Sequence, residues 1–360
     1  MNNRILYIED LVAGSGTIKH ELESKGFEVT VLLPDLFTAI EEAKHYNLIL
    51  IDYRLTAEKG MFDAPTFAQP IRTPKAPSHS DIPIVLVSSE SIISDFYSDP
   101  TSHDLFDLAL PKGELLGNVN RYALRFKSLI DAYDKIQKLK FESEELLGLE
   151  ISGKELVDFR ALETLGDYQH QGNVFTYSSF VLKELVRSIG TLIGEDVLAA
   201  RLGVDQSSKD WSVLKEQMKP IQYAGIYSEA YPRWWGQGLL AQWTSLTGSE
   251  SSLRRATAEE RVALLHASTG LDLRPVAMTK YATSSCYWTI CVETRKAIDP
   301  SDGIELTRRR AWPWQEPHYV SLEDAIEPKE VGTDGKHKRW KHFSTEGKKR
   351  LTEIRKSFEA

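Results

Sequence analysis

Short apolar runs alternate with amphipathic stretches from Arg4 to Phe126. Five of the runs are rich in leucine or β-branched residues: Ile5–Ile8, Val29–Leu33, Leu48–Ile51, Ile84–Val87 and Leu108–Leu110. Runs of this length and composition are typical of strands that are buried on both faces of a parallel sheet. The stretches between them, such as 17–25 and 36–45, have helical spacing. This alternation predicts an α/β fold with a doubly wound, five-stranded parallel sheet and right-handed crossovers.

After this segment the pattern becomes helical. The stretch 126–147 predicts one continuous connector helix, because Phe126, Leu129, Tyr133 and Ile136 follow coiled-coil-like spacing. About two heptads is short for an independent coiled coil. Two interpretations stay open. The apolar stripe packs against the protein's own second domain, or it pairs with a second copy and forms a homodimer.

Residues 151–328 predict a mainly α domain that is rich in tryptophan. Apolar residues between 181 and 192 recur at helical spacing, and Gly203 is placed to end a further helix that begins near Glu195. Pro232 suits the first position of another helix. One apolar face of that helix would carry Trp235, Leu239 and Trp243.

Further along the second domain, Thr257 and Glu260 have the spacing of a capping box at the start of a helix. The runs 285–293 and 304–308 predict two strands. Because the turn-forming sequence 299–303 lies between them, we expect a small β-hairpin on the helical domain.

The composition limits the class of protein. A chain of 360 residues exceeds one comfortable hydrophobic core, which predicts at least two domains. Two cysteines cannot build a disulfide framework, in agreement with a reducing environment. No apolar run approaches the roughly 20 residues that span a bilayer, and the first residues lack a signal-peptide pattern. We therefore expect a cytoplasmic protein.

The net charge of −8 is unevenly distributed. Residues 1–126 hold 11 lysines and arginines against 18 aspartates and glutamates, whereas residues 329–360 form a basic tail with 10 against 5. The acidic first domain argues against nucleic-acid binding there, because neutralising phosphates requires a positive surface. The tail keeps nucleic acid open as a partner, although a solvated or docking helix capped by Ser344 also explains it.

Polar residues stand where the predicted strands end. Glu9 and Asp10 follow the first strand, Asp52 follows the third, Ser88 ends the fourth and Lys112 follows the fifth. In a parallel sheet these positions meet at the carboxyl edge, where ligands bind. Crowded carboxylates repel each other unless a cation neutralises them, and Mg²⁺ prefers such all-oxygen sites. Together with a lysine, this arrangement predicts an aspartate that accepts a phosphoryl group.

In the order and spacing of these residues, the first domain resembles the receiver domain of response regulators. The resemblance implies that Asp52 is the phosphorylated aspartate, and that Glu9, Asp10 and Asp52 hold Mg²⁺. It also implies that the Ser88 hydroxyl follows the phosphoryl group and that Lys112 is its ion-pair partner. The partner would be a histidine kinase or a phosphotransfer protein of a bacterial two-component system.

Several features depart from the family. The stretch between Asp52 and Ser88 is longer than usual and contains four prolines: Pro65, Pro70, Pro74 and Pro77. Since proline disfavours the helix interior, the third crossover helix should be short or replaced by a loop. Ala109 stands where the family often has a signalling aromatic residue, and Pro111 precedes the lysine rather than following it. A receiver fold that no longer accepts phosphate therefore stays open as an alternative.

The second domain offers one candidate binding surface. Arg308, Arg309 and Arg310 stand beside Trp312 and Trp314, and exposed arginine and aromatic side chains together suit a protein interface or single-stranded nucleic acid. A solvated strand edge is the alternative. The sequence shows no zinc-ligand spacing, nucleophile elbow or phosphate-binding loop, although an enzymatic site built from distant residues stays open.

These observations predict four parts: a receiver-like domain (1–126), a connector helix (127–150), a helical effector domain (151–328) and a basic tail (329–360). The leading hypothesis is a signalling protein in which phosphorylation of Asp52 switches a domain that binds an effector protein. The alternatives are a scaffold with an unphosphorylated receiver fold and a regulator that binds nucleic acid through its tail.

Overall fold

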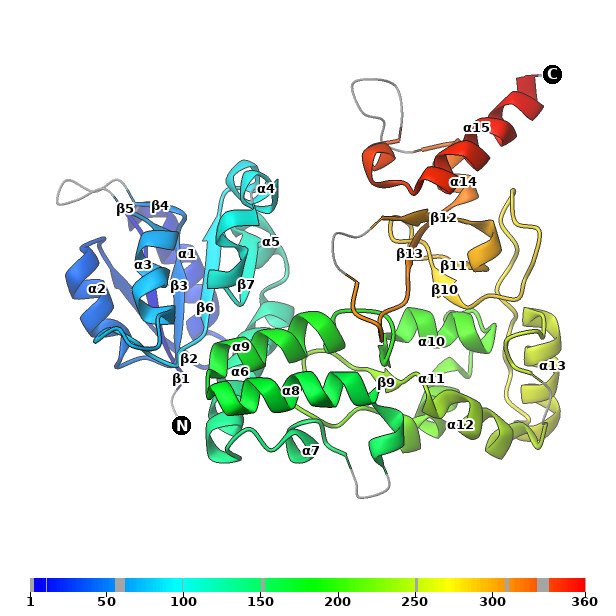
Figure 1. Cartoon of the computed structure of the whole chain (residues 1–360), viewed down its shortest axis with the longest axis horizontal. Coiled ribbons are helices and arrows are strands. Elements are labelled where there is room, and N and C mark those ends of the chain that lie inside the picture. Colours follow the sequence, from blue (N-terminus) through cyan, green and yellow to red (C-terminus); the bar gives the residue numbers. More distant parts are fainter. Residues whose placement is uncertain are drawn as a thin grey trace. The chain divides into compact units, whose positions relative to one another are not determined.

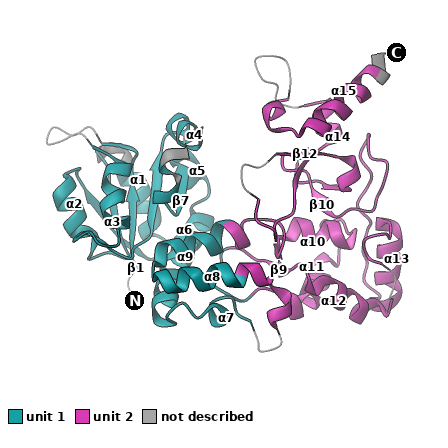
Figure 2. Cartoon of the chain, in the orientation of Figure 1, with its two compact units in different colours: residues 1–150, 162–183, 224–230 teal, residues 151–161, 184–223, 231–360 magenta. Residues whose placement is uncertain are grey.

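The computed structural model describes residues 3–10, 12–55, 62–98, 100–149, 153–249, 252–307, 311–328 and 337–359. The chain divides into two compact units (Figure 2). Unit 1 contains residues 1–150, 162–183 and 224–230, and unit 2 contains residues 151–161, 184–223 and 231–360. Unit 1 is therefore assembled from three separate stretches of chain. In the part of the chain that is described, every helix is too short or too polar to cross a membrane.

Unit 1 is built around a parallel sheet (Figure 1). Its strands are β1 (Asn3–Ile8), β2 (Phe27–Leu32), β3 (Leu48–Ile51), β6 (Ile84–Ser88) and β7 (Leu108–Pro111). The strand order is β2-β1-β3-β6-β7, and every neighbouring pair is parallel. All side chains of β3 and β6 are buried, as expected for central strands covered on both faces. The predicted doubly wound five-stranded sheet is confirmed.

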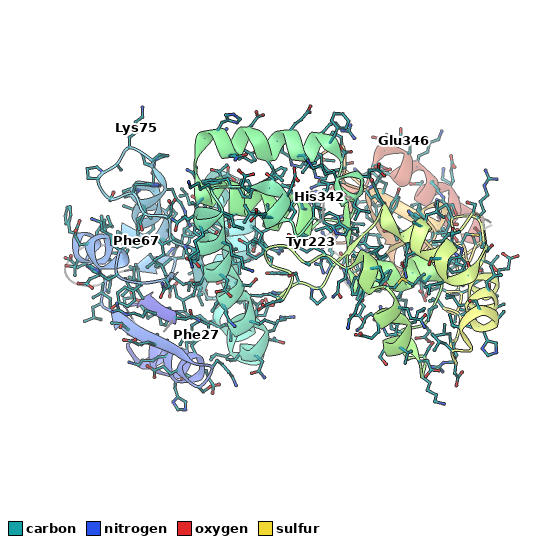
Figure 3. The ribbon with its side chains drawn as sticks, turned by 90° about the horizontal axis from the view of Figure 1, so that it is seen from below. Phe27, Phe67, Lys75, Tyr223, His342 and Glu346 are labelled. Carbon is teal, nitrogen blue, oxygen red and sulfur yellow. The ribbon has the colours of Figure 1, made fainter. Side chains whose placement is uncertain are left out.

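Nine helices are described from residue 12 to residue 180: α1 (Val12–Glu23), α2 (Leu36–Ala43), α3 (Ala64–Arg72), α4 (Glu90–Ser98), α5 (Lys112–Gly117), α6 (Val119–Lys138), α7 (Ser143–Leu146), α8 (Phe159–Gln171) and α9 (Val174–Phe180). Two short strands, β4 (Arg54–Leu55) and β5 (Phe62–Asp63), and the 3₁₀ turn Pro100–Leu105 complete the crossovers. The third crossover helix, α3, has nine residues and contains Pro70, so the prolines neither replace it by a loop nor make it shorter than α2 or α4. Phe67 is buried on α3, whereas Lys75 extends outward from the turn that follows (Figure 3).

The connector is not one continuous helix. Helix α6 ends at Lys138, because Lys140 and Phe141 adopt positive φ angles of 49° and 63° that interrupt the helix. The apolar stripe that includes Phe126 and Ile136 is fully buried, and α6 packs against α9 inside unit 1. This stripe is therefore not available as a coiled-coil seam for a homodimer.

Unit 2 is mainly helical and carries small antiparallel ribbons. A π-helix (Val181–Val186) leads into it from unit 1. Its other helices are α10 (Glu195–Leu202), α11 (Trp211–Gln217), α12 (Gly238–Thr247), α13 (Ala258–Thr269), α14 (Leu322–Ile326) and α15 (Thr345–Glu359). Its strands are β8 (Leu192–Ile193), β9 (Trp234–Trp235), β10 (Thr289–Ile290), β11 (Ala297–Ile298), β12 (Gly303–Leu306) and β13 (His318–Ser321). Short 3₁₀ turns lie at Gly153–Leu156, Lys219–Ile221, Pro300–Asp302 and Trp340–His342.

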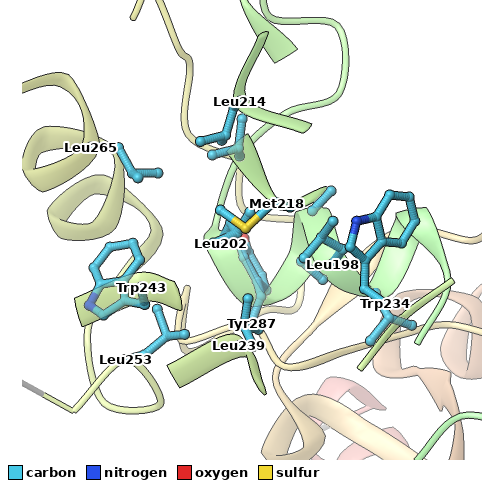
Figure 4. Close-up of a cluster of buried hydrophobic side chains, with 14 of the residues drawn as sticks. Leu198, Leu202, Leu214, Met218, Trp234, Leu239, Trp243, Leu253, Leu265 and Tyr287 are labelled. Atoms are coloured by element: carbon cyan, nitrogen blue, oxygen red, sulfur yellow. The ribbon is translucent and has the colours of Figure 1, made fainter. Parts of the chain in front are cut away.

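The tryptophans of unit 2 lie mostly in its core. Trp234 and Trp243 are buried among leucine and methionine side chains (Figure 4). Gly203 ends α10 with a left-handed φ of 70°, and Thr257 and Glu260 form the predicted capping box of α13. Both of these helix boundaries are confirmed.

The prediction that Pro232 begins a helix is wrong. Trp234 and Trp235 form β9, which pairs with β8, and α12 begins only at Gly238. The apolar spacing that suggested a helix here reflects burial of large side chains. The pairing that decides the backbone conformation comes from a strand about 40 residues earlier, beyond the reach of local periodicity.

The predicted hairpin around 299–303 is also wrong in its pairing. Strand β10 pairs with β11 before that turn, and β12 pairs with β13 after it. The turn itself forms a 3₁₀ segment in which the Asp299 carboxylate accepts a hydrogen bond from the backbone of Ser301. Two small antiparallel ribbons therefore replace the single expected hairpin.

The tail ends in helix α15. The hydroxyl of Ser344 accepts a hydrogen bond from the backbone nitrogen of Gly347 at 3.1 Å, so the predicted cap is confirmed. Leu351 is buried in a small core that includes Ile304 of β12 and Ala325 of α14. This packing fastens α15 to unit 2.

Candidate functional site

The sheet brings the predicted site residues to one edge. The chain leaves β1 toward β2 on one side, while β3 lies on the other side of β1. Such a reversal of strand order opens a crevice at the carboxyl ends of the two central strands. Glu9 and Asp10 directly follow β1, and Asp52 directly follows β3. The acids therefore stand at the switch point of the sheet.

Asp52 is the centre of a hydrogen-bond network. Its Oδ1 accepts from the Ser88 hydroxyl at 2.5 Å and from the backbone nitrogen of Tyr53 at 2.6 Å. Its Oδ2 accepts from Lys112 Nζ at 2.5 Å. Asp52 is buried except for a small exposed fraction, so each of these contacts acts with little screening by water. The carboxylate is held in a fixed orientation at the carboxyl edge of the sheet.

Lys112 connects the two strand ends. Its Nζ also donates to Oε2 of Glu9 at 2.5 Å, and Glu9 Oε2 accepts a further bond from the hydroxyl of Tyr7 at 2.8 Å. Glu9 and Tyr7 are completely buried, whereas the Lys112 side chain is 26% exposed. The lysine thus neutralises two acids from the open side of the pocket.

The acidic residues form a group that fits a divalent cation. One carboxylate oxygen from each of Glu9, Asp10 and Asp52 lies within 4.8 Å of the others. Glu9 and Asp52 are buried and Asp10 is half-buried. An all-oxygen donor set with one partly exposed member suits Mg²⁺, which binds few carboxylates and keeps several waters.

The protonation of the pocket follows from these contacts. Burial alone would lower the pKa of Lys112, but its hydrogen bonds to Asp52 and Glu9 raise the pKa above its ordinary value. Burial and the neighbouring Glu9 carboxylate also raise the pKa of Tyr7. Lys112 is therefore a cation and Tyr7 a hydrogen-bond donor at neutral pH.

Sequence reasoning missed two members of this neighbourhood. Tyr7 lies in the middle of an apolar strand, and its hydroxyl was the one signal that a buried acceptor stands nearby. Tyr97 on α4 is 55% exposed, and its hydroxyl donates to the Ala109 carbonyl at 2.8 Å. An aromatic side chain from α4 thus contacts the backbone at Ala109. The residue spacing around Lys112 does not reveal this contact, because Tyr97 lies on a different element.

The second predicted surface has a different character. Trp314 is buried, and its indole nitrogen donates to the Glu184 carbonyl at 3.2 Å. Trp312 is half-buried and stacks on Trp314 with ring centroids 4.9 Å apart. Trp314 therefore packs within unit 2 and does not offer an exposed ring. Arg308, Arg309 and Arg310 lie outside the described residues.

Residues 1–126 have the doubly wound fold that receiver domains share with flavodoxin-like proteins, since their five-stranded parallel sheet and its strand order match that fold. No family model matches the chain, and no curated protein matches it in sequence.

Several solved structures are similar to this part of the chain. A response regulator receiver domain from Methylobacillus flagellatus is 20% identical, with 35% of this chain and 99% of that chain covered and a TM-score of 0.29. The receiver domain of a sensor histidine kinase from Pseudomonas aeruginosa, with a magnesium ion coordinated in its active-site cleft, is 22% identical. That match covers 36% of this chain and 99% of the other, with a TM-score of 0.29. A structure described as an adenylate cyclase from Rhodopirellula baltica is 17% identical over 40% of this chain and all of its own, with a TM-score of 0.32.

Proposed function

We propose that this protein is a response-regulator-like signalling protein that accepts a phosphoryl group on Asp52. The observation that supports this most directly is the convergence of Ser88 and Lys112 on the Asp52 carboxylate. A buried aspartate that is held by a hydroxyl and an ammonium group, at the open end of a sheet, is placed to act as a nucleophile. Residues 151–328 would pass the change to an effector protein.

Glu9, Asp10 and Asp52 would hold Mg²⁺, whose chemistry is to spread the charge of the transferring phosphoryl group. An oxygen of Asp52 would attack the phosphorus of a phosphohistidine on a histidine kinase or phosphotransfer protein. The new O–P bond forms as the P–N bond breaks, and the released histidine nitrogen keeps the electron pair. The solved receiver domain with a magnesium ion in its cleft provides a precedent for such a site.

Lys112 and Ser88 have separate roles in this proposal. Before transfer, Lys112 balances the charges of Glu9 and Asp52. After transfer, the ammonium group would turn to the phosphoryl oxygens, because these carry more negative charge than the carboxylate they replace. The Ser88 hydroxyl would donate to the same group and draw the end of β6 toward it.

The experiment is phosphorylation of the full chain by acetyl phosphate with Mg²⁺. We expect an alkali-labile adduct on the wild-type protein and none on Asp52→Asn. Asp63→Asn is the matched control, since asparagine caps the start of α3 as well as aspartate does. Labelling that persists in Asp52→Asn, or its absence from the wild type, would exclude the proposed role. The latter result would favour the alternative of a scaffold with an unphosphorylated receiver fold.

A second candidate function rests on helix α15. Its inner face is fixed by the buried Leu351, while Lys349 and Lys356 are exposed on its outer face together with Glu346 and Glu353, and Lys341 is exposed just before it. The tail as a whole, with 10 lysines and arginines against 5 acids, supports nucleic acid as a candidate ligand. Neutralising these three lysines should then weaken binding to DNA and reduce its dependence on salt. Equal binding at low and moderate salt by the wild-type protein would contradict this candidate.

A further inference from the structure

We propose that Tyr7 is a positioning residue of the metal site, holding the Glu9 carboxylate in the orientation that Mg²⁺ requires. This inference rests on the proposed function, since it assigns Glu9 to the metal. Tyr7 would not touch the ion or the phosphoryl group. It would act on both through Glu9.

The placement of Tyr7 follows from strand geometry. Side chains two residues apart on a strand lie on the same face, so Tyr7 in β1 and Glu9 directly after it point to the same side of the sheet. Tyr7 is paired within the sheet with Val31 of β2 and Leu50 of β3. Both Tyr7 and Glu9 are completely shielded from solvent, and the hydroxyl donates to Glu9 Oε2 at 2.8 Å.

A tyrosine is an unusual choice at this position. The neighbouring residues of β1, from Ile5 to Ile8, are otherwise apolar, and a phenylalanine ring would fill the same space without a polar group to satisfy. The buried hydroxyl is accounted for by its bond to the Glu9 carboxylate. The sequence therefore provides a donor where a buried acid needs one.

The Lys112 contact does not make this donor redundant. Lys112 bonds to both Glu9 and Asp52 at 2.5 Å, and its side chain is 26% exposed. When Lys112 turns toward a phosphoryl group on Asp52, its hold on Glu9 weakens. Tyr7 lies on β1, which is paired on both sides by β2 and β3, and would keep its contact with Glu9 in both states.

The expected effect is on metal affinity. Hydrogen-bond partners of metal-ligating side chains fix the orientation of those ligands, and their loss typically weakens binding by about 10- to 100-fold. Tyr7→Phe removes one oxygen and keeps the ring, so the packing of β1 stays intact. We expect the Mg²⁺ dissociation constant of this variant to rise at least about tenfold, measured by isothermal titration of the full chain with MgCl₂.

Tyr133→Phe is the matched control. Tyr133 is also buried in unit 1, and its hydroxyl donates to a carboxylate oxygen, Asp107 Oδ1, at 2.7 Å. Asp107 precedes β7 at the opposite edge of the sheet from the metal site. Loss of Mg²⁺ affinity in Tyr7→Phe but not in Tyr133→Phe supports the proposal. Equal affinities of Tyr7→Phe and wild type, or equal losses in both variants, would overturn it.

A second readout separates this inference from the proposed function. Labelling of Tyr7→Phe by acetyl phosphate should need more Mg²⁺ but reach the wild-type level at saturation, because Asp52 and Lys112 are unchanged. If labelling of Tyr7→Phe stays low at saturating Mg²⁺, the positioning role is refuted while the phosphoacceptor role of Asp52 stands. If wild-type protein neither binds Mg²⁺ nor becomes labelled, both proposals fail.

Discussion

The buried ion pair at the amino edge of the sheet offers a sharp test of what stabilises unit 1. Asp107 Oδ2 accepts from Arg72 Nη2 and from the backbone nitrogen of Ile84, both at 2.8 Å, and Oδ1 accepts from Tyr133. The Asp107 side chain is completely buried, and that of Arg72 is 6% exposed. The guanidinium also lies 3.9 Å from the ring centroid of Phe175 on α9. One carboxylate therefore joins β6, β7, α3 and α6.

Replacing Asp107 by alanine leaves the Arg72 charge buried without its acid. Removing one partner of such a pair typically costs about 3–5 kcal/mol. The backbone of Ile84 and the hydroxyl of Tyr133 lose acceptors as well, at about 1–3 kcal/mol each, but these losses overlap with the first. We expect Asp107→Ala to lower the free energy of unfolding of unit 1 by about 4 kcal/mol. Arg72→Met should cost a similar amount, and the double variant should cost less than the sum.

Hydrogen–deuterium exchange of the full chain, read by mass spectrometry on peptides from β6 and β7, measures the opening of unit 1 separately from unit 2. The double-mutant cycle gives the coupling between Arg72 and Asp107, expected near the upper end of the usual range of about 0.5–3 kcal/mol. The reasoning would be refuted if Asp107→Ala lowered the free energy of unfolding by less than about 1 kcal/mol. It would also be refuted if the losses of the two single variants added fully in the double variant.

Two further predictions concern unit 2. Gly190→Ala should destabilise it by about 3 kcal/mol, because an added Cβ would lie 2.0 Å from the Trp314 carbonyl oxygen; an unchanged melting temperature would contradict this. Burial would raise the pKa of Asp299, but hydrogen bonds from the Ser301 backbone and the Ser284 hydroxyl hold it below its ordinary value. Asp299 therefore adds stability above its unfolded pKa of about 4, and that stability is lost as the pH falls through the lower folded pKa. Urea unfolding at decreasing pH should show a smaller acid-dependent loss in Asp299→Asn than in wild type.

The sequence predicted the first domain well because each of its signals is local. The five strands are continuous apolar runs, and Glu9, Asp52 and Lys112 directly follow strand ends, so strand order alone determines that they meet. The sequence did not predict which contacts the pocket would contain, because side-chain hydrogen bonds depend on geometry that spacing does not encode. Tyr7 is the example. In the sequence it looks like an ordinary strand residue, and only the structure shows that its hydroxyl donates to Glu9.

The fold of unit 2 was harder to predict from the sequence, for a physical reason. Its strands are two to four residues long, and β8 pairs with β9 although about 40 residues of mostly helical chain separate them. Such short strands carry little periodicity of their own. The π-helix after α9 is equally invisible to spacing, because its apolar residues on either side of Lys183 and Glu184 have the pattern of an ordinary helix. Helix caps such as Thr257 and Gly203 were predictable because capping depends on one or two residues.

The discontinuous make-up of unit 1 has a consequence for how the protein folds during its synthesis. Its last contributing stretch is 224–230, and between its pieces the chain passes into unit 2 and returns. Domains generally fold as units during synthesis, starting from the amino terminus. Here the sheet can form early, yet unit 1 stays incomplete until residue 230 has left the ribosome. The residues of the Asp52 pocket, from Glu9 to Lys112, are thus synthesised more than 100 residues before the unit that contains them is finished at residue 230.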